Sequence, residues 1–480
     1  MSVHSPTSHS FPENAREALG DEKLQRSLAS AKMGFRVRRG DAAARLPEFE
    51  TLRDESRDIK NHTLAHIDLY LEAFEKRVTE RGGHVHWAAD AAEACEAVLM
   101  ICRAAGAKTV TKGKSMISEE MGLNAFLEKN NIEPVETDLG EYIIQLRNET
   151  PSHIIAPAFH VLKEQVIETF REKHTHLDPD RTIEEARQLQ DEARQVLRER
   201  FLAADVGITG ANFLIAETGS TVIVTNEGNG DLTQTLPRVH IVLASLEKVV
   251  PTLEDASTLL RVLARSATGQ EYSSYTTFST GPRRGEDIDG PHEFHVVLLD
   301  NGRTGLIGTE MQDVLRCIRC GACMNHCPVF GVVGGHAYGW VYPGPIGAVL
   351  SPSLIGMEEA HHLPNASTFC GRCEEVCPVR IPLPKLMRHL REREFEKGIS
   401  PATVRRGLAT WAWFAKRPAF YRLATALPIR LMALLAGRKG RFRRWPLAGG
   451  WTSQRDLPAP QGRTFQAMWD TRGGRREVSK

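Results

Sequence analysis

The stretch Cys317–Phe330, CIRCGACMNHCPVF, carries four cysteines in the spacing C-x2-C-x2-C-x3-C, followed by a proline. Further along, Ser367–Pro382 reads STFCGRCEEVCPVRIP, with three cysteines spaced C-x2-C-x3-C and again a proline. The first spacing is that of bacterial ferredoxins, in which three thiolates on a tight loop bind one cubane and the fourth binds a neighbouring cluster. Zinc sites favour two separated C-x2-C pairs instead. The pattern therefore predicts iron–sulfur clusters.

Aligning the two motifs by their ends places Ser367 where the first motif has Cys317. The crossed pattern of two-cluster ferredoxins then assigns one [4Fe–4S] cluster to Cys317, Cys320, Cys323 and Cys377. It assigns the second to Cys327, Cys370 and Cys373. The fourth corner of the second cluster is left to Ser367, another ligand or solvent. We expect that cluster to be either intact but more labile, or a [3Fe–4S] cluster.

Three histidines between the motifs, His336, His361 and His362, are alternative ligands, or tune a cluster through a hydrogen bond. The competing interpretation for each is an ordinary surface or loop histidine. Cys95 and Cys102 lie on one predicted helix among Ala, Val, Leu and Met, so we expect them to pack in a core.

Strand and helix patterns alternate upstream of the cysteines, which predicts an α/β domain with a parallel sheet. The expected strands are 84–88, 108–112, 133–137, 153–158, 213–217, 220–226, 238–245 and 294–300. The expected helices are 59–83, 90–106, 118–131 and 182–201, with Asp90 and Glu93 forming a capping box. We therefore expect an N-terminal helical segment over 1–60, the α/β domain over 61–300, a mainly helical ferredoxin-like domain over 303–395 and a basic extension over 396–480.

Charge is spread unevenly along the 480 residues, whose net charge is 61 − 60 = +1. Residues 401–480 hold 17 Lys/Arg and 3 Asp/Glu, so they carry +14 and the rest of the chain −13. A basic segment of this kind either docks on an acidic partner, a membrane surface or nucleic acid, or is a solvated, partly disordered tail. Its mixture of aromatics, leucines and arginines favours an amphipathic segment on a membrane surface or partner subunit over nucleic acid.

Residues 410–437 are the most apolar stretch, but Lys416, Arg417, Arg422, Arg430 and two prolines interrupt them. A span needs about 20 nearly uncharged residues, so we expect none. The N-terminal residues have no apolar core typical of a secretory signal. These features predict a cytoplasmic protein.

Two stretches of the α/β region are candidate sites. KGKS at 112–115 lacks the first glycine of a phosphate loop, yet it precedes a helix and is either an anion-binding loop or a polar turn with solvated lysines. In AETGSTVIVTNEGN, Glu217 ends a strand, Gly219 allows a sharp turn and the glycine-rich segment 226–230 follows the next strand. Glu217 is a candidate catalytic residue, although the same residues suit a hairpin.

Several segments resemble the iron–sulfur proteins of the lactate utilization protein B family. They are the two cysteine motifs, TVTKGKSMISEEMGLN (109–124), GITGANFLIAETGSTVIVTNEGNG (207–230), GGHAYGWVYPGPIGAVLSP (334–352) and PAPQGRTFQAMW (458–469). The resemblance implies an α/β domain similar to sugar-phosphate isomerases and coenzyme A transferases, and it implies that a serine in the Ser367 position is a family trait.

The resemblance also implies a function. It indicates an electron-transfer subunit acting with a cysteine-rich protein and a small α/β-domain protein in the oxidation of L-lactate to pyruvate. No segment resembles a flavin-binding dehydrogenase module. Two alternatives stay open: an enzyme whose α/β domain has its own catalytic site, and a redox-sensing scaffold controlled by the second cluster.

Overall fold

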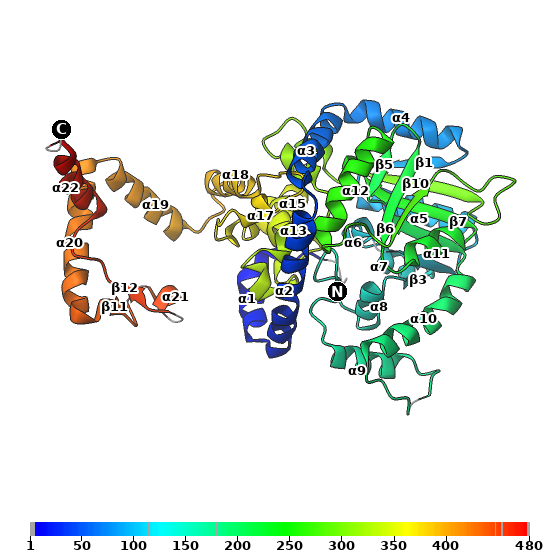
Figure 1. Cartoon of the computed structure of the whole chain (residues 1–480), viewed down its shortest axis with the longest axis horizontal. Helices are drawn as coiled ribbons and strands as arrows, with labels where there is room; N and C mark the ends of the chain where they lie inside the picture. Colours follow the sequence, from blue (N-terminus) through cyan, green and yellow to red (C-terminus); the bar gives the residue numbers. More distant parts are fainter. Residues whose placement is uncertain (1–4, 114, 179, 447, 453–454, 478–480) are drawn as a thin grey trace. The chain divides into compact units, whose positions relative to one another are not determined.

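The computed structural model describes residues 5–113, 115–178, 180–446, 448–452 and 455–477. The chain divides into two compact units, Met1–Glu394 and Phe395–Lys480 (Figure 1). The α/β segment and the cysteine motifs therefore share the first unit, and each unit is described below by itself.

A six-stranded sheet forms the centre of the first unit. Its strands follow the order β1-β10-β7-β4-β2-β3, and every neighbouring pair is parallel. The strands are β1 (His84–Ala88), β10 (Glu293–Leu299), β7 (Val239–Ser245), β4 (Val206–Gly210), β2 (Thr109–Lys112) and β3 (Glu133–Glu136). The predicted parallel sheet is confirmed, with β4 as a strand that the sequence analysis did not anticipate.

Both faces of this sheet are buried, as parallel sheets require. Along β7, Ile241 and Leu243 pack into a core on one face, whereas Val242 and Ala244 pack into the core on the other. The first core is covered by α5 (Ala91–Ala104), α6 (Met116–Glu120) and α7 (Leu123–Lys129), and the second by α4 (Ile67–Glu80). Cys95 and Cys102 are 3% and 0% exposed in the first core, and burial raises the pKa of each thiol to about 12.

A second, four-stranded sheet packs against the α4 face. Its order is β8-β5-β6-β9, from β8 (Val249–Val250), β5 (Phe213–Ile215), β6 (Ser220–Thr225) and β9 (Tyr275–Ser279). The expected strands at 213–217 and 220–226 form an antiparallel hairpin here, not part of the parallel sheet. Gly219 lies at its turn with φ +70°, where an added Cβ would approach Arg77 Cβ to 2.7 Å.

Three expectations about local structure are wrong. Residues 153–158 form turns and not a strand, because the Nδ1 of His153 accepts hydrogen bonds from Ile155 N and Ala156 N at 3.0 and 3.1 Å. The expected helix 118–131 is divided into α6 and α7 at Gly122, whose φ is +66°. The expected helix over 59–83 is divided at His66 into α3 (Phe49–Ala65) and α4.

The remaining α/β helices complete the layers. They are α8 (Leu139–Leu146), α9 (Lys163–Lys173), α10 (Ala186–Ala203), α11 (Asn229–Thr235) and α12 (Leu253–Ala267). Helices α8, α9 and α10 share a small core of their own that includes Phe170 and Leu197. Asp90 caps α5 by accepting from Ala92 N and Glu93 N at 2.9 and 3.0 Å, and Glu93 accepts from Ala89 N at 2.8 Å.

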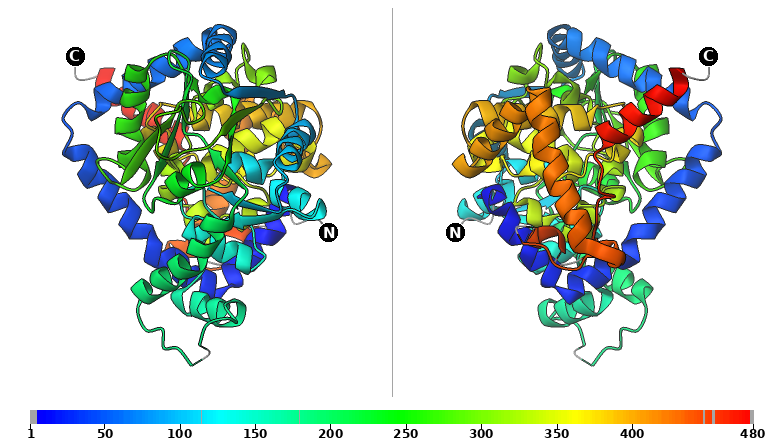
Figure 2. Two further views of the ribbon diagram at one scale, coloured as in Figure 1. Left: turned by 90° about the vertical axis from the view of Figure 1, so that its right-hand side faces the viewer. Right: turned by 90° about the vertical axis from the view of Figure 1, so that its left-hand side faces the viewer.

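The cysteine motifs lie in a region of short helices. These are α13 (Ala322–Asn325), α14 (Phe330–Val333), α15 (Gly344–Leu354), α16 (Met357–Ala360), α17 (Arg372–Glu375) and α18 (Leu383–Glu396). The N-terminal helices α1 (Phe11–Gly20), α2 (Glu22–Ala44) and α3 run along the outside of the first unit (Figure 2). They contact the cysteine region, since α1 and α2 both pack against α14.

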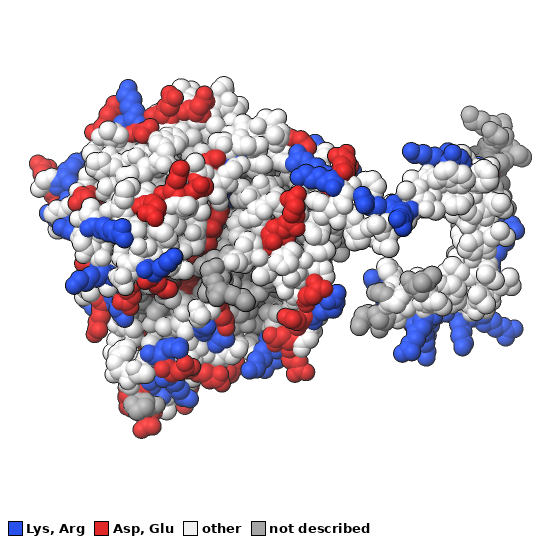
Figure 3. Space-filling model, turned by 180° about the vertical axis from the view of Figure 1, so that it is seen from behind, with Lys and Arg blue, Asp and Glu red and all other residues white. Residues whose placement is uncertain are grey.

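The second unit is mostly helical and basic. It contains α19 (Ala402–Ala415), α20 (Pro418–Ala436), α21 (Gly449–Thr452), α22 (Phe465–Glu477) and the short antiparallel pair β11 (Arg441–Phe442) and β12 (Leu457–Pro458). Lys and Arg dominate its charged surface in Figure 3. Of the described residues, one helical segment, Pro418–Lys439, is long and apolar enough to cross a membrane by length and composition, with mean hydropathy 1.4. The expectation that its arginines and prolines exclude this by composition is therefore corrected.

Candidate iron–sulfur sites and a cavity beside them

The two cysteine motifs share one backbone conformation. When the two motifs are aligned by their ends, Cys370 corresponds to Cys320. The residues directly before these cysteines, Arg319 and Phe369, have φ of 60° and 53°. The glycine after each of these cysteines is left-handed, at Gly321 (φ 69°) and Gly371 (φ 79°), and each glycine begins a short helix. Left-handed backbone is uncommon outside glycine, so its recurrence supports the alignment that places Ser367 opposite Cys317.

The first cage is lined by all four cysteines that the crossed pattern assigned to it. Its cysteines are Cys317, Cys320, Cys323 and Cys377. Apart from Arg319, the other lining side chains are apolar, among them Ile318, Ile346 and Leu383. A thiolate set within a dry, apolar wall is the donor chemistry that a [4Fe–4S] cluster needs.

The second cage is lined by Cys327, Cys370, Cys373 and Ser367, again as the crossed pattern predicts. Cys370 is exposed, so this cage is more open to solvent at that corner. His326 also lines it; the sequence analysis did not single out this residue, although its place directly before Cys327 was a usable signal.

The histidines suggested as alternative ligands do not line either cage. The Nε2 of His336 lies 2.7 Å from Thr150 O, and its ring stacks edge-on with that of His160. The rings of His361 and His362 pack on each other with centroids 4.0 Å apart. Besides the three cysteines, the described lining of the second cage offers Ser367, Thr368, His326 and Met387 as side chains that could supply a fourth ligand.

Backbone amides and burial suit the cysteines to metal-bound thiolates. The sulfurs of Cys317, Cys327 and Cys377 accept from Arg319 N, Phe330 N and Ile381 N at 3.4, 3.5 and 3.4 Å, and such bonds tune cluster potentials. Burial raises the pKa of Cys373 to about 12, and it also raises the pKa of Cys320 and Cys323. Thiols so desolvated ionise when a cation binds them.

Among the described residues, no group of three or more His, Cys, Asp or Glu side chains could hold a single metal ion such as zinc. A cubane places its cysteines on separate irons, so its thiolates surround a cavity instead of meeting at one point. The two cages have this second arrangement.

Arginines of the N-terminal helices donate hydrogen bonds to backbone carbonyls of the cluster loops. Arg36 Nε donates to Asn325 O at 2.8 Å, Arg39 Nη2 to Val376 O at 2.9 Å and Arg53 Nη2 to Cys377 O at 2.8 Å. Arg39 and Arg53 are 9% and 3% exposed. These hydrogen bonds hold the N-terminal helices against the cluster loops and bring positive charge close to the cages.

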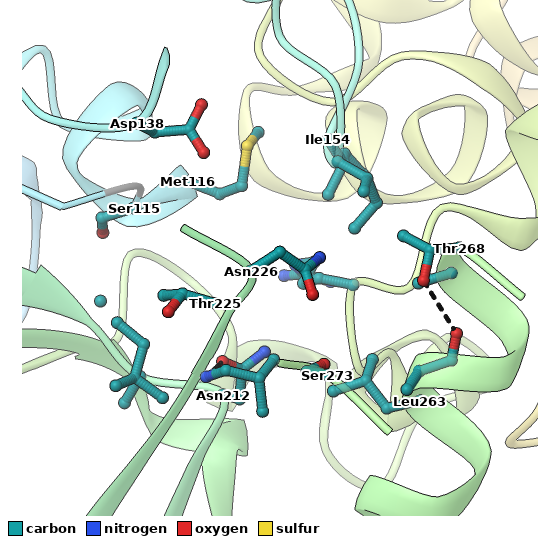
Figure 4. Close-up of a pocket in the computed structure, with 18 of the residues that line it drawn as sticks. Ser115, Met116, Asp138, Ile154, Asn212, Thr225, Asn226, Leu263, Thr268 and Ser273 are labelled. Carbon is teal, nitrogen blue, oxygen red and sulfur yellow. Dashed lines mark hydrogen bonds between the residues drawn. The ribbon is translucent and has the colours of Figure 1, made fainter. Parts of the chain in front are cut away.

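A separate cavity of about 220 Å³ opens at the carboxyl edge of the parallel sheet. In the sheet, β2 lies between β3 and β4. Where the connections from neighbouring parallel strands run in opposite directions, a crevice opens at the carboxyl ends of those strands, and ligands bind there. Figure 4 shows Asp138, Met116 and Ile154 along one side of this cavity, with Asn226 and Asn212 opposite. The glycine-rich segment 226–230 contributes Asn226, Glu227 and Asn229 to the lining.

The other sequence candidates lie elsewhere. Glu217 is exposed at the hairpin and accepts from Leu253 N at 3.2 Å, and it does not line the cavity. Lys112 is 0% exposed and pairs with Glu136 and Glu119 at 2.6 and 3.0 Å, so it is not a solvated lysine. Ser115 lines the cavity, and Lys114 lies outside the described residues.

Two cations that the sequence analysis missed also line the cavity, Lys248 and Arg319. Glu247 Oε1 pairs with Arg319 Nη2 at 3.1 Å, and Glu247 Oε2 with Arg303 Nε at 3.1 Å. Burial alone would raise the pKa of Glu247, but Arg303 and then Arg319 lower it to about 2. Burial, followed by the charge of Arg319, lowers the pKa of Lys248 to about 7. A charged residue following a buried strand was the available signal for Lys248.

Known families match the chain along most of its length. The LUD domain matches residues 71–299, the 4Fe-4S dicluster domain 313–381 and the C-terminal domain of lactate utilisation protein B 387–474. The chain is 44% identical over 470 residues to the lactate utilization protein B of Oceanobacillus iheyensis, covering 96% of each. It belongs to the lactate utilization protein B family. The protein of that name from Bacillus subtilis is 42% identical over 459 residues, with 95% of each chain covered.

One solved structure, a DUF162 family protein from Deinococcus radiodurans, is also similar. It shares 17% identity with a TM-score of 0.26, covering 48% of this chain and 98% of its own. Membership of the lactate utilization protein B family supports an iron–sulfur protein that serves lactate utilization.

Proposed function

We propose that this chain is the electron-transfer subunit of a three-component system that oxidises L-lactate to pyruvate, and that it uses two [4Fe–4S] clusters. The observation that carries the proposal is the interleaving of the two cages. Cys323 lines the first and Cys327 the second, while Cys373 lines the second and Cys377 the first. The two cysteines of each pair are four positions apart, so even an extended chain keeps them within about 14 Å, and the cages are neighbours linked twice through the chain.

Each bound cubane would supply a one-electron redox couple. Oxidation of lactate to pyruvate releases a pair of electrons, and two neighbouring one-electron sites match that pair. The protein's part is to hold the cysteines, to donate backbone N–H groups to their sulfurs and to keep Arg39 and Arg53 buried near the cages. Ser367 completes the second cage with an oxygen where its counterpart has sulfur.

The proposed partners are a cysteine-rich subunit and a small subunit made of the α/β domain alone. The chain would work in the cytoplasm, with its basic tail on an acidic partner surface or on the membrane surface. Along α20, Leu423, Leu427 and Leu431 recur every four residues and are 61%, 61% and 58% exposed. Such an apolar stripe on a segment rich in arginine is typical of helices that lie on a membrane or a partner.

Lactate-dependent reduction tests the electron-transfer proposal. The full chain, purified anaerobically, is mixed with L-lactate alone and then with both partners, and cluster reduction is followed by EPR. We expect reduction only when the partners are present, and reduction by the isolated chain would instead make this chain the lactate-oxidising enzyme. Cys320→Ala should abolish the signal of the first cluster, whereas Cys102→Ala, at a buried cysteine outside the cages, should keep it.

Charge removal in the full chain tests the role of the tail. Replacing Arg441, Arg443 and Arg444 by Gln should weaken binding to vesicles containing anionic lipid if the tail docks on membrane, and should weaken capture of the partners if it docks on protein. Unchanged binding in both assays would refute a docking role for these arginines. The variant's clusters should remain intact, because the tail is a separate compact unit.

A further inference from the structure

Two buried cations line the cavity at the sheet edge, and each keeps a side-chain nitrogen without a partner among the described residues. Lys248 and Arg319 are 7% and 8% exposed. The described part of the chain gives Lys248 Nζ no hydrogen bond and no ion pair, and Arg319 Nη1 is buried without a hydrogen-bond partner. A buried donor without a hydrogen-bond partner is costly, so two such donors at one cavity indicate a ligand with acceptor oxygens, such as a carboxylate.

The carboxylates near the cavity leave Lys248 Nζ and Arg319 Nη1 unpaired among the described residues. Around Lys248 and Arg319 lie two further buried cations, Lys60 and Arg303, and two buried carboxylates, Glu247 and Glu120. Asp138 and Glu227 also line the cavity, so the four cations are matched by four carboxylates and the ligand is indicated by the unpaired nitrogens, not by net charge. Glu120 is engaged by both Nη atoms of Arg303 at 2.8 and 2.6 Å. Cys317 of the first cage lies near both Arg319 and Lys248.

The size and lining of the cavity restrict the ligand. A cavity of about 150 Å³ holds a molecule such as benzene, whereas pockets for drug-sized ligands begin near 300 Å³. At about 220 Å³, this cavity suits a molecule of a few carbons. Besides the two cations and the carboxylates of Asp138 and Glu227, it presents Asn212, Asn226 and Ser273. Their amides and hydroxyl can bind a hydroxyl or carbonyl oxygen.

We propose that this cavity binds a small 2-hydroxy or 2-oxo monocarboxylate, with its carboxylate between the Lys248 ammonium and the Arg319 guanidinium. Its second oxygen would face Asn212 and Asn226. The choice of a monocarboxylate rests on the proposed function in lactate oxidation, whereas the need for acceptor oxygens rests on the unpaired donors of the cavity.

The site adjoins the first cage. Arg319 and Ile154 line both the cavity and that cage, so one layer of side chains separates a bound carboxylate from the cysteines. Arg319 is also fixed by Glu247 and lies over the ring of Tyr342, with Cζ 4.8 Å from its centroid. Occupancy of the cavity should therefore alter the EPR signal of the first cluster more than that of the second.

Binding to the anaerobically purified full chain tests the proposal. Isothermal titration with L-lactate, pyruvate and inorganic phosphate should give saturable binding of the two carboxylates and weaker binding of phosphate. Lys248→Met should weaken carboxylate binding at least about tenfold, because a hydrogen bond to a charged group is lost. Lys163→Met, the same change at a lysine on α9 that does not line the cavity, should bind as the unmodified protein does.

A second measurement uses the unmodified protein and does not depend on the folding of a variant. Mass spectrometry after brief treatment with acetic anhydride should show that L-lactate slows acetylation of Lys248 and leaves that of Lys163 unchanged. Undetectable carboxylate binding, tighter binding of phosphate, or acetylation of Lys248 that lactate does not slow would each overturn the proposal. Lactate-driven cluster reduction with the partners, measured on the same preparation, reports the electron-transfer function separately, so either proposal can fail alone.

Discussion

Ser367 and Cys317 hold equivalent positions in the two cluster motifs. Ser367 Oγ accepts a hydrogen bond from Phe369 N at 3.1 Å, and Cys317 Sγ accepts one from Arg319 N at 3.4 Å. In both cases the donor is two residues further along the chain. The serine oxygen is thus held where the first motif holds its thiolate, which favours an oxygen-bound iron over an empty corner.

This equivalence predicts the effect of changing Ser367. Ser367→Ala removes the oxygen and should lower the iron content by about one per chain, with an oxidised three-iron EPR signal. Ser367→Cys should keep all irons and slow the loss of the second cluster in air. Ser353→Ala on α15, away from both cages, is the control. Full iron content in Ser367→Ala would show that another group, such as His326, is the ligand.

Arg39 should raise the reduction potential of the clusters. Reduction adds negative charge to a cluster, and a buried cation nearby stabilises that charge. For a guanidinium roughly 10 Å from the cluster and an effective dielectric constant of about 20, the interaction energy is about 1.7 kcal/mol, or about 70 mV for one electron. Arg39→Gln should therefore lower a cluster midpoint potential by tens of millivolts in an EPR-monitored titration. Arg16→Gln, at an exposed arginine paired with Glu13, should leave the potentials unchanged, and equal potentials in both variants would contradict the electrostatic role.

The buried pair between Arg303 and Glu120 should hold the α/β and cluster regions together. Both side chains are at most 1% exposed, and Glu120 also accepts from Tyr342 Oη at 2.6 Å. Removing one partner of such a pair costs about 3–5 kcal/mol, so Arg303→Met should shift denaturant unfolding strongly, followed by both circular dichroism and cluster absorbance. Arg393→Met breaks an exposed pair with Glu310 and should cost at most about 1 kcal/mol.

His240 predicts a pH dependence of stability. Burial, and next the neighbouring His295, lower the pKa of His240 to about 3, against about 6.5 in an unfolded chain. The unfolded state then binds the extra proton below pH 6.5, so stability is full above pH 6.5 and falls by about 1.4 kcal/mol per pH unit as pH drops toward 3. His240→Gln should reduce the pH dependence of the unfolding free energy between pH 6.5 and 5. His176→Gln, at an exposed histidine, should leave that dependence unchanged, and equal slopes in the two variants would refute the role of His240.

Local spacing explains why the grouping of the cysteines around two cavities could be predicted. Cysteines three and four residues apart are constrained by the loop that carries them, so Cys317 through Cys327 and Cys370 through Cys377 could be assigned to cages from the sequence. Strands such as β7 and β10 were predicted because continuous apolar runs mark buried strands, and both are almost wholly buried. The failure at 153–158 arose because the His153 side chain satisfies backbone amides that a strand would pair with a neighbour.

Distant contacts explain what the sequence analysis missed. Lys248 lies after β7 and Arg319 between two cluster cysteines, and only the tertiary fold brings both to one cavity. Lys248 belongs to no binding motif, and Arg319 occupies one of the unspecified positions of the cluster motif. Glu217, by contrast, had a suggestive local pattern, yet the hairpin turns it outward.

The central claim, two neighbouring clusters held by seven cysteines and Ser367, is tested most directly by metal analysis. The full chain, purified anaerobically, is assayed for iron and acid-labile sulfide and examined by EPR before and after dithionite. We expect about eight irons per chain and the signals of two interacting reduced cubanes. Stoichiometric zinc without iron would contradict the account.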